Sequence, residues 1–201
     1  MIGPLSRWVL KAALDQLVTL GTMLNMAVNL SARNLHDMEL PATVSRLLAD
    51  IGIDPEYLTL EITESAVMSN PSDGLIILTA LDKMGVTLAI DDFGTGYSSL
   101  AYLKRLPVDE LKIDKSFVME MEENENDAVI VRSTIDLAHN LGLKVTAEGV
   151  ETQDAWDTLS ILGCDQSQGY FMGRPMSVEK LDQWLRESDR STLAASALHT
   201  V

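Results

Sequence analysis

Polar or acidic residues close almost every one of a series of apolar, β-rich segments, and this repeated pattern constrains the fold more than any other feature of the sequence. The segments cover residues 23–29, 58–62, 86–91, 110–114, 144–147 and, more weakly, 165–170. Amphipathic helical patterns lie between them, as at Leu40, Val44, Leu47, Leu48 and Ile51. Alternating strands and helices indicate a parallel sheet covered by helices, and therefore an α/β fold.

The residues that end these segments favour one of the two layouts open to such a sheet. An open doubly wound sheet that binds dinucleotides carries Gly-x-Gly-x-x-Gly after its first strand, and this chain has no such motif there. Active sites of (β/α)₈ barrels, in contrast, are assembled from the ends of several strands at one face. We therefore predict a (β/α)₈ barrel, of which six clear strands are found, with the chain opening on a helix at 5–17. Helix starts are predicted at 71–73 and 152–154, and helix stops at Gly52, Gly85, Gly142 and Gly163.

Composition and charge limit the location and the partners of the protein. The 201 residues, 46% of them hydrophobic, fit one globular domain, which we assign to 1–187, followed by a disordered tail at 188–201. Fifteen basic against thirty acidic residues give a net charge of −15, which argues against binding long nucleic acid. The longest charge-free stretch, 16–32, contains polar residues, so we expect no membrane insertion. Cys164 is the only cysteine, which fits a reducing cytoplasm.

The acidic strand ends would form a concentrated negative cluster if they met at one face. Asn29, Glu61, Asp91, Asp92 and Glu148 supply four carboxylates and an amide. Two like charges about 4 Å apart repel by roughly 4 kcal/mol at a protein-like dielectric, so the cluster must take up protons or cations. Oxygen ligands without His or Cys favour Mg²⁺ or Mn²⁺, and the adjacent aspartates suit two metal ions with Asp91 bridging. An acid of this kind taken alone more often caps a helix or faces solvent, but the whole series at successive strand ends favours a metal site.

Six motifs occur in order along the chain. They are Val28-Asn29-Leu30-Ser31, Leu60-Glu61-Ile62-Thr63-Glu64, the stretch from Ala89-Ile90-Asp91-Asp92-Phe93 to Leu100, Leu111-Lys112-Ile113-Asp114, Ala147-Glu148-Gly149-Val150-Glu151 and Gln168-Gly169-Tyr170. Together they resemble the motif set of the EAL-domain phosphodiesterases, over about residues 2–185. The resemblance implies a TIM-barrel-like EAL fold and metal-dependent hydrolysis of cyclic di-GMP to linear pGpG in bacterial second-messenger signalling.

The resemblance also implies roles for single residues. Asn29, Glu61 and Asp91 match the ligands of a first Mg²⁺ or Mn²⁺ ion, and Asp91 and Asp92 match those of a second. Lys112 matches the lysine that holds the nucleophilic water.

Five further residues match less direct roles. Glu148 matches a carboxylate that acts as general base or as a ligand of the second metal. Asp114, Glu151 and Gln168 match supporting polar positions near substrate and metals. Glu64 matches the residue that anchors the loop 93–99 after the aspartate pair.

One departure from the family pattern bears on fold and activity. The Glu-Ala-Leu motif of the first barrel strand does not occur, and Met1-Ile2-Gly3-Pro4 resembles the stretch before the next family helix. We therefore expect a barrel without that strand, its metal-binding glutamate and the nearby arginine that contacts substrate. The alternative functions are a cyclic di-GMP receptor without turnover and a protein-interaction module. The unpaired sheet edges, and the family's dimer contact near a helix predicted at 98–106, suggest a homodimer or higher oligomer.

Overall fold

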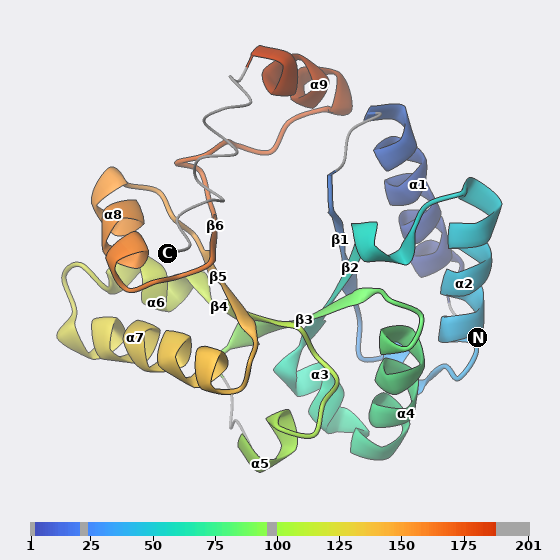
Figure 1. Ribbon diagram of the computed structural model, residues 1–201, viewed down its shortest axis with the longest axis horizontal. Helices are drawn as coiled ribbons and strands as arrows, with labels where there is room; N and C mark the ends of the chain where they lie inside the picture. The colour runs from blue at the N-terminus through green and yellow to red at the C-terminus, as the bar shows by residue number, and fades with distance from the viewer. Residues whose placement is uncertain (1–2, 21–23, 96–99, 188–201) are drawn as a thin grey trace.

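Six parallel strands form one curved sheet in the computed structural model, which describes residues 3–20, 24–95 and 100–187. The strands are β1 (Met26–Leu30), β2 (Leu58–Thr63), β3 (Thr87–Phe93), β4 (Glu110–Ile113), β5 (Lys144–Glu148) and β6 (Gln166–Gln168). Each strand pairs with the next in chain order, from β1 to β6. Figure 1 shows the sheet curving like part of a barrel wall, with an open side between β1 and β6. The described residues therefore confirm a TIM-barrel-like α/β fold that lacks closure.

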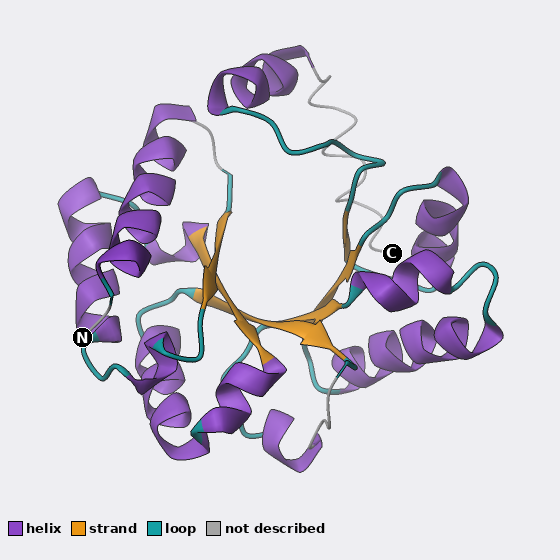
Figure 2. Cartoon of the chain, turned by 180° about the vertical axis from the view of Figure 1, so that it is seen from behind, coloured by secondary structure: helices purple, strands orange, loops and turns teal. Residues whose placement is uncertain are grey.

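Helices surround the sheet, most of them on its convex side (Figure 2). They are α1 (Pro4–Leu20), α2 (Leu40–Ile51), α3 (Glu64–Ser69), α4 (Pro71–Asp82), α5 (Leu100–Leu103), α6 (Lys115–Glu120), α7 (Glu125–Asn140), α8 (Gln153–Ile161) and α9 (Val178–Glu187), with short 3₁₀ turns η1 (Asn34–His36) and η2 (Pro55–Tyr57). Of these, α9 lies beside the open side of the sheet, near α1 (Figure 1). Side-chain caps begin several of them: the side chain of Asn70 accepts from the N–H of Asp73, and that of Thr152 from the N–H of Ala155. The predicted starts of α4 and α8 are confirmed.

The two faces of the sheet differ in chemistry, because successive side chains of a strand point to opposite sides. The outward side chains are apolar and buried against the helices; they include Leu58, Leu60, Ile62, Leu88, Ile90, Leu111, Ile113 and Val145. The inward side chains surround a cavity of about 540 Å³ and are mostly polar, among them Thr59, Glu61, Thr87, Glu110, Lys112, Thr146, Gln166 and Gln168. Barrel interiors are usually filled by bulky branched residues. Because this inner face is polar instead, it is the expected location of a functional site.

Some predicted boundaries were wrong. The predicted strand 165–170 is only Gln166–Gln168, and the strand predicted from residue 23 begins at Met26. The helix predicted at 98–106 ends as an α-helix at Leu103, because Pro107 disfavours helical conformation in the residue before it. Residues 23, 98 and 99, the end of the loop 93–99 and the predicted tail 188–201 lie outside the described residues. No helix in the described part of the chain has the length and apolar character needed to cross a bilayer.

Candidate active site

The carboxyl ends of the strands bring the predicted site residues to one edge of the sheet. Asn29 of β1 lies opposite Glu61 of β2, and Glu148 of β5 lies opposite Gln168 of β6. Lys112 belongs to β4, between β3 and β5. Because the strands are parallel and follow each other in order, residues far apart in the sequence meet in a polar layer at this end of the inner face. Lys112 is level with Thr146 in the ladder, and Glu148 lies one inward position further along β5.

Lys112 is the centre of this layer. Its side chain is almost fully buried, and its Nζ donates to Glu61 Oε1 at 2.6 Å and lies 2.5 Å from Glu148 Oε1 and 3.6 Å from Asp91 Oδ1. Burial alone would lower the pKa of Lys112, but the hydrogen bonds to Glu148 and Glu61 outweigh it and raise the pKa above its ordinary value. Lys112 is therefore a permanent cation at neutral pH, suited to orienting or neutralising a group rather than to accepting a proton.

Asp91 and Asp92 reach the same place through a break in the regular strand. The register between β3 and β4 shifts by one residue between Ile90 and Phe93, so β3 bulges at the aspartate pair. Asp92 has a φ of 55°, in the left-handed region that residues other than glycine rarely adopt. In a regular strand the two side chains would alternate between the faces. The bulge lets both carboxylates serve one site, at the cost of local strain.

The acidic residues of this layer fit a divalent cation. Oxygen atoms of Asp91, Asp92 and Glu148 all lie within 4.8 Å of one another. Burial raises the pKa of Asp92, and the charges of Asp91, Asp114 and Glu148 raise it further. Burial also raises the pKa of Glu148, against the hydrogen bond from Lys112. Both shifts arise first from burial and then from repulsion between the carboxylates, and bound cations would oppose both effects. An all-oxygen donor set suits hard ions such as Mg²⁺ or Mn²⁺.

The remaining predicted residues lie around this centre. Asp114 caps α6 and accepts hydrogen bonds from the N–H and the hydroxyl of Ser116. Glu64 starts α3, because Thr63 ends β2 and caps that helix, so its side chain leaves the inner face. Glu151 is exposed in the loop after β5. The structure thus brings Glu61, Asp91, Asp92, Lys112 and Glu148 together, and places Glu64 and Glu151 in separate positions.

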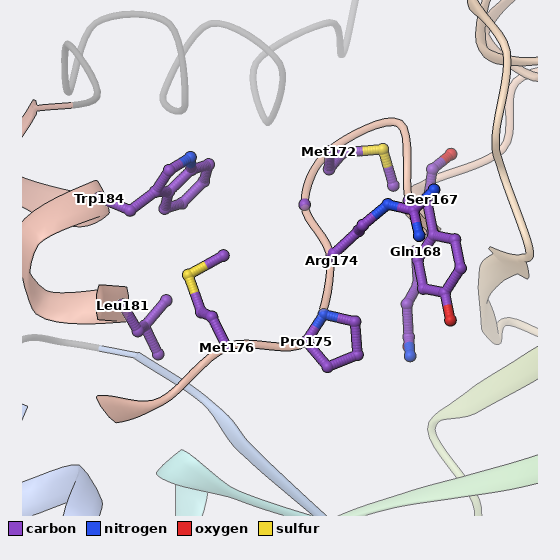
Figure 3. Close-up of a pocket in the computed structure, with 11 residues that line it drawn as sticks. Ser167, Gln168, Met172, Arg174, Pro175, Met176, Leu181 and Trp184 are labelled. Atoms are coloured by element: carbon purple, nitrogen blue, oxygen red, sulfur yellow. The ribbon is translucent and has the colours of Figure 1, made fainter. Parts of the chain in front are cut away.

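Two features of the site were missed in the sequence. The hydroxyl of Thr146 donates to Glu110 Oε1 at 2.5 Å, one inward position below Glu148 and Lys112. A second pocket, of about 450 Å³, opens beside the end of β6, between the loop that follows and α9. Figure 3 shows Arg174 in this pocket, and its guanidinium lies 4.7 Å from the centre of the Tyr170 ring. The periodicity of two on β4 and β5 indicated the first feature; the spacing of known motifs gave no sign of the second.

The turn after Glu148 gives a testable consequence for stability. Gly149 has a φ of +73°, and a Cβ added there would lie 2.5 Å from the Cβ of Lys115. Gly142 has nearly the same φ, +77°, but open space around it. Alanine at Gly142 is expected to cost about 1–2 kcal/mol of unfolding free energy, from backbone strain alone. At Gly149 the overlap adds about 1–3 kcal/mol.

Urea denaturation of the two alanine variants measures this difference, with Gly142→Ala as the matched control. Equal unfolding free energies would show that Lys115 moves aside without cost. A larger loss at Gly149 indicates that the turn after Glu148 is held rigidly by α6.

Comparison with known proteins agrees with this arrangement. A family model described as the EAL domain matches residues 1–175. The cyclic di-GMP phosphodiesterase NbdA of Pseudomonas aeruginosa is 43% identical over 190 residues, which are 92% of this chain and 24% of NbdA. The chain spans about a quarter of the length of the curated relatives it matches.

Solved structures share the fold over most of the chain. The P. aeruginosa MucR phosphodiesterase in complex with cyclic di-GMP has a TM-score of 0.84 and 45% identity, covering 88% of this chain and 73% of that one. Klebsiella pneumoniae BlrP1, in a complex with manganese and cyclic di-GMP, has a TM-score of 0.79 and 31% identity, covering 85% and 44%. With the family model matching residues 1–175 of 201, this chain belongs to the EAL domain family.

Proposed function

We propose that this chain binds cyclic di-GMP at the carboxyl ends of its strands and hydrolyses it to linear pGpG with bound Mg²⁺ or Mn²⁺. The observation that carries the proposal is the buried ammonium of Lys112, hydrogen-bonded to Glu61 and Glu148 and surrounded by further carboxylates. Such an ammonium can stabilise the negative charge that develops on a phosphate in the transition state, in addition to any attraction for the bound phosphate. The names of the relatives NbdA and MucR support the same substrate.

Charge explains why the site needs cations to accept this substrate. Glu61, Asp91, Asp92 and Glu148 together carry three more negative charges than Lys112 neutralises. A cyclic dinucleotide brings two phosphodiester anions to the same place and would be repelled. Two divalent cations would give the empty site a net charge of about +1, which would attract the dinucleotide instead of repelling it. We propose Asp91 as the residue shared by both ions, Asn29 and Glu61 as further ligands of one, and Asp92 with Glu148 as ligands of the other.

The protein's own residues then have separate tasks in hydrolysis. Cations held by these carboxylates would stabilise the negative charge that builds up on the phosphate oxygens. Lys112 uses two of its three donors on Glu61 and Glu148, which fixes the ammonium and leaves a donor for the attacking water or a phosphate oxygen. Glu148 has the alternative role of general base: burial raises its pKa, which would make it a suitable acceptor for the proton of that water if it does not ligate the second ion. Gln168, Asp114 and Glu151 are proposed as supporting polar groups, and Glu64 as the anchor of the loop after Asp92.

A direct assay tests the proposal. The purified chain is incubated with cyclic di-GMP and Mn²⁺, and the products are separated by chromatography. We expect linear pGpG to accumulate, and a chelator to stop its formation. Nucleotide that is retained by the protein but stays intact would overturn the hydrolytic role and favour the receptor alternative.

Association of copies is a further proposal. Among the described strands, β1 and β6 each pair on one side only. Unpaired strand edges favour pairing with another chain. We expect a homodimer or higher oligomer at tens of micromolar in sedimentation, and a monomer would remove association from the mechanism.

A further inference from the structure

Two aspartates occupy equivalent positions at the amino ends of neighbouring parts of the sheet. Asp109 directly precedes β4 and lies three residues before Lys112. Asp165 directly precedes β6 and lies three residues before Gln168. Neither aspartate belongs to the carboxylate cluster at the other end of the strands.

Asp109 ties β4 to both of its neighbours. Its Oδ2 accepts from the backbone N–H of Leu88 at 2.8 Å, and its own N–H donates to the carbonyl of Leu88 at 2.9 Å. Its carbonyl accepts from the N–H of Lys144 at 2.9 Å. Leu88 is fully buried, so its N–H has no access to water and depends on the Asp109 side chain.

Asp165 makes the equivalent side-chain contact between β6 and β5. Its Oδ2 accepts from the N–H of the fully buried Val145 at 2.8 Å. The same oxygen lies 2.9 Å from His139 Nε2, near the end of α7. In both cases the aspartate lies one step before the first paired residue and continues the register of the ladder, since Ala89 pairs with Glu110 and Thr146 with Gln166.

The register between β3 and β4 depends on an additional side-chain contact more than the other registers of the sheet do. Below the bulge only two regular pairs remain, Ala89 with Glu110 and Ile90 with Leu111. A slip of one residue would turn Lys112 to the outer face, and a slip of two would move it by about 6.6 Å. Either slip would break the contacts of Lys112 Nζ with Glu61 at 2.6 Å and with Glu148 at 2.5 Å.

We propose that Asp109 is a positioning residue for Lys112, and that Asp165 has the same role for Gln168. Asp109 fixes the height of β4 relative to β3 and β5, and the ammonium consequently meets Glu61 and Glu148 at once. Asp109 itself stands at the opposite end of the strand from the reacting groups. The kinetic consequence rests on the proposed hydrolysis; the structural one does not.

The structural consequence is measured by the reactivity of Lys112 towards an amine-acylating ester, followed by mass spectrometry of the peptide. Asp109→Ala is expected to raise the labelling rate of Lys112 by about tenfold or more, because the ammonium leaves its buried contacts. Asp109→Asn keeps an acceptor oxygen for Leu88 and should stay close to the wild type. Asp165→Ala is the matched control: it removes the same contact from β6 and should leave Lys112 protected. Wild-type labelling in Asp109→Ala, or equal labelling in Asp109→Asn and Asp109→Ala, would overturn the proposal.

The kinetic consequence is a fall in kcat without a rise in KM. A displacement of about 1 Å near reacting groups can cost about a hundredfold in rate, so we expect that loss in Asp109→Ala and recovery to within a few-fold in Asp109→Asn. A higher KM with unchanged kcat would contradict positioning of Lys112. If circular dichroism shows Asp109→Ala unfolded, Asp109→Glu, which displaces the acceptor by one methylene, takes its place in both measurements with the same expected direction. A wild type without turnover would refute the proposed function, while the labelling comparison would still decide the role of Asp109.

Discussion

Lys112→Ala is expected to reduce turnover of cyclic di-GMP by about 10²–10³-fold while Mn²⁺ binding persists. The loss follows from the geometry: the ammonium is held by Glu61 at 2.6 Å and Glu148 at 2.5 Å, where it can orient water or neutralise a phosphate oxygen. A protonated lysine has no lone pair with which to bind a metal. Its removal frees two carboxylates, so the affinity for Mn²⁺ should stay the same or rise. Chromatographic assay of turnover and calorimetric titration of Mn²⁺ measure the two effects separately.

Lys83→Ala is the matched control, since Lys83 is an exposed lysine at the end of α4. It should change neither quantity. In metal-free buffer Lys112→Ala should also be less stable, by up to about 3–5 kcal/mol, because Glu61 and Glu148 lose their buried counterion. Added Mn²⁺ should restore much of that stability. Turnover at the wild-type rate would show that Lys112 is structural and that its role in hydrolysis was wrongly inferred.

The barrel class followed from the sequence because nearly every predicted strand has a polar or acidic residue at or near its carboxyl end, as the active sites of such barrels require. Glu61, Lys112 and Glu148 come from separate parts of the chain, and parallel pairing is enough to bring their ends together. The α/β fold class and the incomplete barrel were therefore predictable. The roles of these residues in catalysis stay predictions.

The detailed geometry was not predictable, because it depends on contacts between distant segments. Lys112 and Glu61 are 51 residues apart, and nothing local shows that the lysine is buried. Alternation along β3 would have placed Asp91 and Asp92 on opposite faces, and only the bulge with its left-handed Asp92 brings both to the site. The role of Asp109 was not predictable for the same reason, because its partner Leu88 lies 21 residues earlier in the sequence.

Asp91→Asn is expected to alter thermal stability in opposite directions with and without Mn²⁺: the variant should be at least as stable as the wild type without metal, and less stable with it. Without metal, Asp91 adds to a cluster in which the charges of Asp91, Asp114 and Glu148 raise the pKa of Asp92. Removing one charge relieves this repulsion, so the variant should unfold at the same or a higher temperature than the wild type in chelator. Loss of the ion pair with Lys112 Nζ, at 3.6 Å, opposes this gain, but it is one attraction against the repulsion of Asp91 by both Asp92 and Glu148.

With bound metal the wild type should be more stable than Asp91→Asn. A ligand at a hundred times its dissociation constant stabilises the folded state by about 2.7 kcal/mol, and the proposed bridging position of Asp91 gives it a part in both ions. Wild-type protein should therefore gain stability on addition of Mn²⁺, while Asp91→Asn gains almost none. Asp136→Asn, the same chemical change at an exposed position on α7, is the control and should behave as the wild type. Thermal unfolding with and without Mn²⁺ measures all three proteins. Equal gains in the wild type and in Asp91→Asn would mean that Asp92, Glu148 and Glu61 hold the cations without Asp91, and the two-metal assignment would have to be abandoned.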